Sequence, residues 1–407
     1  MFKLIGIIFM LLLGLGQVAC GSDDSKSKSD GGADGDTDGD TDGDTDGDTD
    51  GDSDGDSDGG TDSGSNTYDF KAAAPWYECP SEDFPKEVTV IEALHQVDHF
   101  ITWGDGAVNA RDLWEDVDFP AEGAWGQVGM WFKLECPKSG KCDFWDRYGS
   151  ISLVLNPDDE KKDWKNIELT RFVTPYKVEM CQYIDVTPMA KYLSGKRKVH
   201  SFIDTWVGPG HANGDGWRVS VKFVFYPDTK AQTNEVVNIW KKRHINVGKL
   251  DEVADAGVDA GPPKLVSVDS QIDPVTVNIP ADTKKVEAHM ITTGHGFGYT
   301  NNCAEFCQMR QDIIVNGTIY SINPWRADCA DNPVNPQYGT WKYNRNGWCP
   351  GAIAIGDIVD ITDSVKLGED NEIDFNILTA SGDEYNDTSG NGGSPYEVIS
   401  LKLYIYK

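Results

Sequence analysis

The chain has few of the features that mark helical, membrane-spanning or metal-dependent proteins. Apolar residues recur at helical spacing almost nowhere in its 407 residues, which argues against a helical fold. After residue 20, no apolar run is long enough for a transmembrane helix. The seven histidines do not cluster with cysteines as zinc ligands do. His95 and His99 in "HQVDH" have no third ligand nearby, so we interpret them as surface or packing residues and expect no metal site.

Residues 21–66 have almost none of the apolar side chains that a folded domain would bury. The repeat "DGDTDGDTDGDTDGDTDGDSDGDSDGG" contains none at all. This segment holds seventeen Asp and two Lys, about half of the chain's net charge of −31. We therefore predict a disordered acidic linker over residues 21–67, and the acidity says little about a substrate. A calcium site is disfavoured, because the EF-hand spacing with its distal glutamate is absent.

Residues 1–20 have the organisation of an export signal. Lys3 precedes the apolar run "LIGIIFMLLLGLG", which is too short to span a bilayer comfortably. The following "QVAC" is similar to the end of a bacterial lipoprotein signal, with Gln17 where leucine is usual, and it predicts lipidation of Cys20. We expect an exported protein, either an outer-membrane lipoprotein that touches the membrane only through this anchor or a secreted or periplasmic protein.

The rest of the chain reads as short strands separated by Gly, Pro and Asn. Apolar and polar residues alternate in "WRVSVKFVFY" and "EVISLKLYIY", and "QDIIVNGTIYSI" contains an Asn316-Gly317 hairpin turn. This pattern predicts an all-β protein of antiparallel sandwiches. The stretch "DEVADAGVDAGPPK" reads as a linker, which gives two domains at 68–250 and 264–407 joined by residues 251–263.

Eight cysteines follow Cys20, an even number that suits disulfides in an oxidising compartment. Local spacing suggests two small rings, "CPKSGKC" and "CAEFC", and one longer loop, and the last pair follows by elimination. A small ring removes little entropy from the unfolded chain but fixes the local backbone. Glu305 inside one ring and Asp146 just after the other would thereby be held as a catalytic or binding carboxylate must be. The predicted pairs are Cys136–Cys142, Cys303–Cys307, Cys329–Cys349 and Cys79–Cys181.

These motifs resemble the peptide-N-glycosidase F family. The first half carries "ECPKSGKCDFWDRY", "RFVTPY", "IDVTPMAKYLSG" and "DTW" in the family's order, and the second carries "NCAEFC" and "NGWCPG". The resemblance covers roughly residues 90–407. It implies two eight-stranded antiparallel jelly rolls packed side by side, with the active site at their interface. It also implies an amidase, without a cofactor, that cleaves between asparagine and the first N-acetylglucosamine of N-linked glycans.

The resemblance also implies roles for individual residues. Asp146 matches the principal catalytic aspartate, and Glu305 matches the catalytic glutamate of the second domain. Asp204 stands where the family has a third, assisting glutamate, and its side chain is one methylene shorter. An arginine beside these carboxylates is expected to lower a carboxyl pKa and keep that group ionised. The residues implied to line the cleft are Arg147, Trp206, Arg345 and Phe306, the last of which replaces a tryptophan.

Three other readings use the same features. A glycoside hydrolase also needs two carboxylates but cleaves between sugars. A non-catalytic glycan-binding lipoprotein would keep the aromatic cleft. A copper monooxygenase of similar architecture needs clustered His or Met ligands, which the sequence lacks. We expect N-glycosylated proteins and glycopeptides as partners, no nucleic acid, and a monomer.

Overall fold

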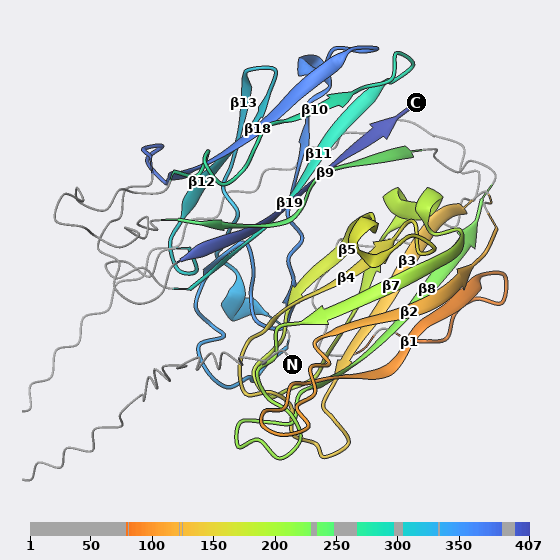
Figure 1. Ribbon diagram of the computed structural model, residues 1–407, viewed down its shortest axis with the longest axis vertical. Coiled ribbons are helices and arrows are strands. Elements are labelled where there is room, and N and C mark those ends of the chain that lie inside the picture. The colour runs from red at the N-terminus through yellow and green to blue at the C-terminus, as the bar shows by residue number, and fades with distance from the viewer. Residues whose placement is uncertain are drawn as a thin grey trace, which may run out of the picture. The chain divides into compact units, whose positions relative to one another are not determined.

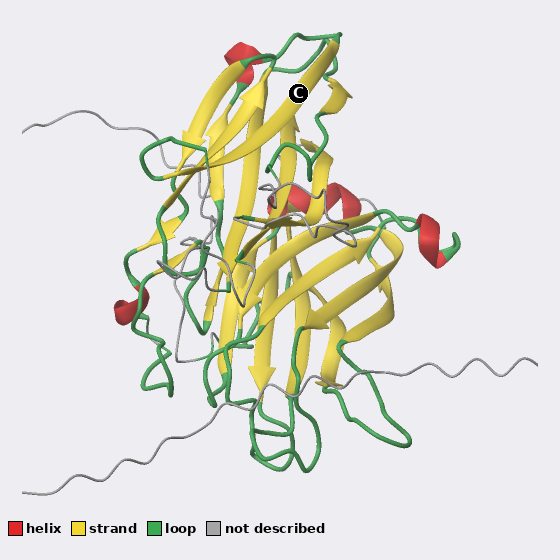
Figure 2. Cartoon of the chain, turned by 60° about the vertical axis from the view of Figure 1, so that its left-hand side comes forward, coloured by secondary structure: helices red, strands yellow, loops and turns green. Residues whose placement is uncertain are grey.

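The computed structural model describes most of the chain beyond residue 78. The predicted export signal (1–20), acidic linker (21–67) and interdomain linker (251–263) lie outside the described residues, as does Cys303. In the described part, antiparallel strands dominate and the four helices are short 3-10 turns (Figure 2). None of the described helices is long and apolar enough to cross a membrane. The described residues are 79, 81–121, 123, 125–228, 234–247, 267–296, 304–332, 334–384 and 395–407.

The first sandwich pairs a sheet of order β1-β8-β3-β6 with a sheet of order β16-β5-β4-β7-β2 (Figure 1). Both sheets contribute side chains to one apolar core. Two 3-10 turns, η1 (Lys161–Asp163) and η2 (Thr187–Tyr192), lie in its loops. The strands are β1 (Thr89–His99), β2 (Asp112–Phe119), β3 (Trp125–Glu135), β4 (Tyr148–Val154), β5 (Asn166–Val173), β6 (Met180–Asp185), β7 (Gly195–Ile203), β8 (Trp217–Pro227) and β16 (Ala352–Ile353).

The second sandwich has sheets of order β10-β18-β12-β13 and β17-β11-β19-β9, which share a second apolar core. A two-stranded ribbon, β14-β15, and two 3-10 turns, η3 (Cys329–Asp331) and η4 (Thr362–Ser364), complete this half. The strands are β9 (Asn234–Asn246), β10 (Val275–Asn278), β11 (Lys285–His295), β12 (Met309–Val315), β13 (Thr318–Ile322), β14 (Trp325–Arg326), β15 (Arg345–Asn346), β17 (Asp357–Asp360), β18 (Asp370–Thr379) and β19 (Tyr396–Tyr406).

Two strands cross the division that the sequence suggested. Strand β9 precedes the predicted linker, yet it pairs with β19 in the second sandwich. Strand β16 comes from the second half and extends β5 of the first sandwich. Val236 of β9 also packs in the first core, and the Tyr192 hydroxyl donates to its carbonyl at 2.9 Å. Strand pairing therefore joins the two halves at two places.

Strand β19 is buried on both faces, although its alternating sequence predicts one buried face. The reason is a polar network against β5. Arg171 is fully buried, forms an ion pair with Glu168 at 2.8 Å and donates to the Val398 carbonyl. Lys402 donates to the Glu168 carbonyl at 2.7 Å. Burial opposes the charge of Glu168, but Arg171 outweighs it and lowers the pKa of Glu168 to about 2. Buried charges satisfied in this way tie the two sandwiches together, because removing one partner would leave the other unpaired.

Disulfides occur at the predicted positions in the described part of the chain. Cys307 is also disulfide-bonded, and Cys303, its predicted partner, lies outside the described residues. The pairs seen in full are Cys79–Cys181, Cys136–Cys142 and Cys329–Cys349.

Candidate active site

Asp146 lies in the loop between β3 and β4, four residues after the Cys136–Cys142 ring. The Tyr176 hydroxyl donates to its Oδ2 atom at 2.6 Å. Arg345 of the second sandwich approaches the same oxygen, with its Nη2 atom at 3.6 Å. One carboxylate oxygen of the first sandwich is thus held by a phenol and by a guanidinium group from the other half of the chain.

Glu305 lies in the loop between β11 and β12 of the second sandwich. Arg345 donates from Nε to its Oε1 atom at 3.2 Å. The backbone N–H of Asn346 donates to the Glu305 carbonyl at 2.9 Å. Gly294 allows this loop to pack closely, since a Cβ atom there would lie 1.7 Å from the Ala304 carbonyl oxygen. Ala304 and Glu305 are therefore packed against β11 and bonded to β15.

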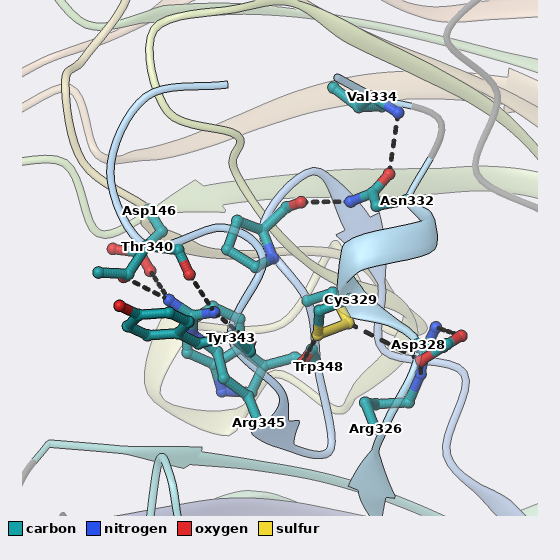
Figure 3. The surroundings of a disulfide bond; sticks show 12 residues. Asp146, Arg326, Asp328, Cys329, Asn332, Val334, Thr340, Tyr343, Arg345 and Trp348 are labelled. Carbon is teal, nitrogen blue, oxygen red and sulfur yellow. Dashed lines mark hydrogen bonds and ion pairs between the residues drawn. A yellow bond between two sulfur atoms is a disulfide. The ribbon is translucent and has the colours of Figure 1, made fainter. Parts of the chain in front are cut away.

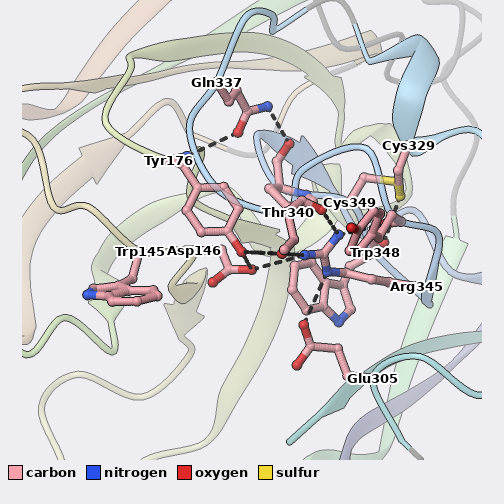
Figure 4. Close-up of polar contacts among 12 residues, drawn as sticks. Trp145, Asp146, Tyr176, Glu305, Cys329, Gln337, Thr340, Arg345, Trp348 and Cys349 are labelled. Carbon is pink, nitrogen blue, oxygen red and sulfur yellow. Dashed lines mark hydrogen bonds and ion pairs between the residues drawn. A yellow bond between two sulfur atoms is a disulfide. The ribbon is translucent and has the colours of Figure 1, made fainter. Parts of the chain in front are cut away.

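Arg345 connects the two carboxylates, and Figure 4 shows it between Asp146 and Glu305. Its side chain is fully buried. Its remaining donors reach the carbonyls of Thr340 at 3.0 Å and Tyr343 at 2.6 Å. Because it is buried and bonded in this way, Arg345 is suited to orient the two carboxylates. The resemblance implied that Arg345 lines the cleft, but it is not among the residues that do so.

Burial governs the protonation of both carboxyl groups. It raises the pKa of Asp146, against the opposing effects of Tyr176 and Arg345. Burial and the nearby charge of Asp146 raise the pKa of Glu305 to about 7. The expected lowering by an arginine is present, since Arg345 opposes the shift of both groups, but burial outweighs it. Two close carboxyl groups with raised pKa values suit a site in which one of them keeps a proton near neutral pH.

A cleft of about 910 Å³ opens beside these groups. Phe306 lines it, as predicted, and so do several aromatic side chains that are partly open to solvent. Trp145 is 51% exposed and Tyr343 is 61% exposed. Apolar ring faces next to carboxyl groups are what a site for sugar rings requires. The lining residues are Trp145, Asp146, Tyr176, Glu305, Phe306, Trp325, Thr340, Lys342, Tyr343 and Asn344.

The other predicted residues do not line this cleft. Arg147 forms an ion pair with Asp143, with Nε at 2.8 Å from Oδ2. Asp204 instead pairs with Arg111 at 3.0 Å. Trp206 stacks on Trp103, with ring centroids 6.0 Å apart.

The charges of Asp204 and Glu305 act on the same tyrosine. Burial raises the pKa of Tyr396, and the charges of Asp204 and Glu305 both add to this effect. Tyr396 is therefore close enough to be affected by both acidic groups, although of these two only Glu305 lines the cleft.

The sequence did not single out Tyr176, Thr340 or the aromatic residues of the loop that the Cys329–Cys349 disulfide closes. Figure 3 shows this loop, which carries Thr340, Tyr343 and Arg345 toward Asp146. Two signals were available. Tyr176 ends the motif "RFVTPY", and the loop is unusually rich in Trp, Tyr and Asn for a connection between strands.

Comparisons with known proteins agree with this arrangement. Residues 265–391 match the model of the family described as peptide-N-glycosidase F, C terminal. The peptide-N(4)-(N-acetyl-β-D-glucosaminyl)asparagine amidase F of Elizabethkingia miricola is 27% identical over 291 residues, which cover 68% of this chain and 73% of that protein. Both matches are to the peptide-N-glycosidase F family.

Solved structures share the fold. A crystal structure of a peptide-N(4)-(N-acetyl-β-D-glucosaminyl)asparagine amidase is 23% identical with a TM-score of 0.60, and the match covers 79% of this chain and 96% of that one. A structure of PNGF-II is 18% identical with a TM-score of 0.56, covering 78% of this chain and 66% of that chain. The chain therefore shares the fold of these solved structures.

Proposed function

We propose that the protein is an amidase that hydrolyses the bond between asparagine and the first N-acetylglucosamine of N-linked glycans. The asparagine becomes aspartate and the glycan leaves intact. The observation that carries this proposal is the meeting of Asp146 and Glu305, one from each sandwich, on the buried Arg345 at the edge of an aromatic cleft. The matched relatives, which are named as amidases of this bond, support the reaction class.

The geometry supports a division of work between the two carboxyl groups. Hydrolysis needs a water molecule activated for attack on the amide carbonyl and a proton for the departing glycosylamine nitrogen. Glu305, with a pKa raised to about 7, is suited to hold and donate a proton near neutral pH. Asp146 is held by Tyr176 and Arg345 through Oδ2, and it is the primary candidate to position and deprotonate the water. Asp204 has an assisting role at most.

The test is digestion of a denatured N-glycoprotein by the protein and by its Asp146→Asn variant, with mass spectrometry of both products. An amidase converts the glycosylated asparagine to aspartate and releases the complete glycan. Sugar left on asparagine would instead identify a glycoside hydrolase. Unchanged glycoprotein that is nevertheless retained by the protein would identify a glycan-binding lipoprotein.

Anchoring to a membrane is a separate part of the proposal. The disulfides and the similarity to the matched amidase support a secreted protein. The "QVAC" junction supports lipidation at Cys20, with the acidic segment as a spacer and the protein acting as a monomer on glycoproteins and glycopeptides. A Cys20→Ser variant should leave the membrane fraction with its activity unchanged, and unchanged partition would contradict the anchor.

A further inference from the structure

A second buried carboxylate lies three residues before Asp146, and the mechanism above does not use it. Asp143 is fully buried. Its Oδ2 atom accepts hydrogen bonds from Arg147 Nε and from the Thr205 hydroxyl, both at 2.8 Å. Its Oδ1 atom accepts the backbone N–H of Trp145 at 3.1 Å. Removing one of these donors would leave a buried carboxylate oxygen short of a partner, which is costly inside a protein.

The partners of Asp143 belong to segments that carry groups of the site. Trp145 and Arg147 are the two neighbours of Asp146 in the chain. Thr205 lies between Asp204 and Trp206. The carboxylate of Asp143 therefore joins the Asp146 loop to the segment of the third candidate carboxylate.

The backbone of Asp143 adds two further connections. Its carbonyl accepts the N–H of Lys177 at 3.1 Å, next to Tyr176, which holds Asp146. Its own N–H donates to the Gly216 carbonyl at 3.2 Å. Four segments that are distant in the sequence thus meet at this one residue.

We propose that Asp143 is a positioning residue for the amidase reaction, which fixes Asp146 beneath Tyr176 and Arg345 and aligns it with the Asp204 segment. The proposal rests on the function proposed above. Catalytic groups must be held within about 0.5 Å of their productive positions. A displacement of about 1 Å costs on the order of 10²-fold in rate. Since Asp143 acts through Asp146, its loss should change the chemical step and leave substrate binding nearly intact.

The first test is Asp143→Asn in the full chain, with kcat and KM measured on one glycopeptide. The substitution keeps the shape but removes the charge that holds Arg147. We expect kcat to fall about 10²-fold, while KM changes less than about threefold. Thermal unfolding of each variant corrects kcat for the folded fraction.

Asp312→Asn is the matched control. Asp312 is also buried, is paired with an arginine through Arg310 Nε at 2.8 Å, and accepts a hydroxyl from Ser321 at 2.7 Å. It does not line the cleft. A purely structural role for Asp143 predicts that both variants lose kcat only in proportion to lost stability, and that result would overturn the proposal.

Thr205→Val removes one donor to Asp143 and is the gentler variant if Asp143→Asn fails to fold. A lost hydrogen bond of this kind corresponds to about 2–10-fold in kcat. The double variant should resemble Asp143→Asn alone, because Thr205 acts through Asp143. Wild-type kcat in Thr205→Val, or effects that simply multiply, would contradict the assignment. An inactive wild-type protein would overturn the proposed function together with this inference, whereas an active wild type with a fully active Asp143→Asn variant would overturn only the inference.

Discussion

Each half of the site has a second, fully buried carboxyl group, and the two groups differ in their partners. In the first sandwich, Asp143 lies behind Asp146 and pairs with Arg147 at 2.8 Å. In the second, Glu397 at the start of β19 accepts a hydrogen bond from Asn346 Nδ2 at 2.6 Å, and the backbone N–H of Asn346 donates to the Glu305 carbonyl. Both carboxyl groups are fully buried. Only Asp143 has an arginine in contact.

The two carboxyl groups differ in what offsets their burial. Burial raises the pKa of Glu397 well above its ordinary value, and neither Asn346 nor the more distant Arg171 offsets this effect. Its Oε2 atom has no hydrogen-bond partner among the described residues. Burial therefore disfavours the charged form of Glu397, whereas Asp143 has an arginine as its ion-pair partner. The first half of the site depends on a charge, and the second depends mainly on shape.

Removing the charge of Asp146 should have the largest effect on turnover, and it tests the part of the site that the first sandwich supplies. Asp146→Asn keeps the size of the side chain but removes a proton acceptor, so we expect kcat to fall about 10²–10⁴-fold. The measurement is steady-state turnover of one glycopeptide, with folding checked for the variant. Turnover close to that of the wild type would show that the site has been misplaced.

Glu305→Gln tests the second half, and we expect a loss of turnover similar to that of Asp146→Asn or somewhat smaller. It should also change the pH dependence of stability. The unfolded chain loses the Glu305 proton near pH 4.5, whereas the folded protein holds it to about pH 7. The wild-type fold is therefore destabilised as pH rises through this range, and by a constant amount above it.

The glutamine variant should be as stable as the wild type near pH 4 and more stable by about 3 kcal/mol near pH 8. Urea unfolding at the two pH values measures this difference. If the variant and the wild type were equally stable at both pH values, the pKa of Glu305 would be the same in the folded and the unfolded protein.

Asp204→Asn should have a smaller effect than either of these changes. Its carboxylate pairs with Arg111 and does not line the described cleft. We expect kcat to fall less than about tenfold and KM to change little. A loss of turnover as large as that of Asp146→Asn would show that Asp204 takes part in the chemical step.

Glu397→Gln should have the smallest effect and is the sharpest test of the comparison. A glutamine closely resembles a neutral glutamic acid, so kcat should stay within about threefold of the wild type. Asp143→Asn, an equally conservative change, should cost far more. If both variants lose activity equally, Glu397 carries a charge and the two halves work alike.

The sequence predicts the all-β class well, because period-two alternation and Asn-Gly turns are local signals. The two small cysteine rings drew attention to Glu305 and Asp146, and the resemblance assigned their roles, since nothing local distinguishes Asp146 from Asp143 in "CDFWDRY". Asp143, the partner of Arg147, lies four residues before it, so their spacing in the sequence could have suggested this ion pair.

Other features depend on contacts between distant segments. The direction of the carboxyl pKa shifts follows from burial between two sandwiches, which no local pattern reveals. The alternation of apolar and polar residues predicts that β9 and β16 are strands, but it does not specify which sheet edge each of them pairs with.

The exchange of β9 and β16 bears on how the molecule folds and on how it could have been assembled. A chain cut at the predicted linker would give two fragments, and each would lack an edge strand that the other carries. Each fragment would expose an unpaired strand edge and the buried charges of Arg171 or Lys402. The described core should therefore melt in a single cooperative transition. Asp146 and Glu305 are then carried by one folding unit, and neither half of the site could be inherited, or lost, without the other.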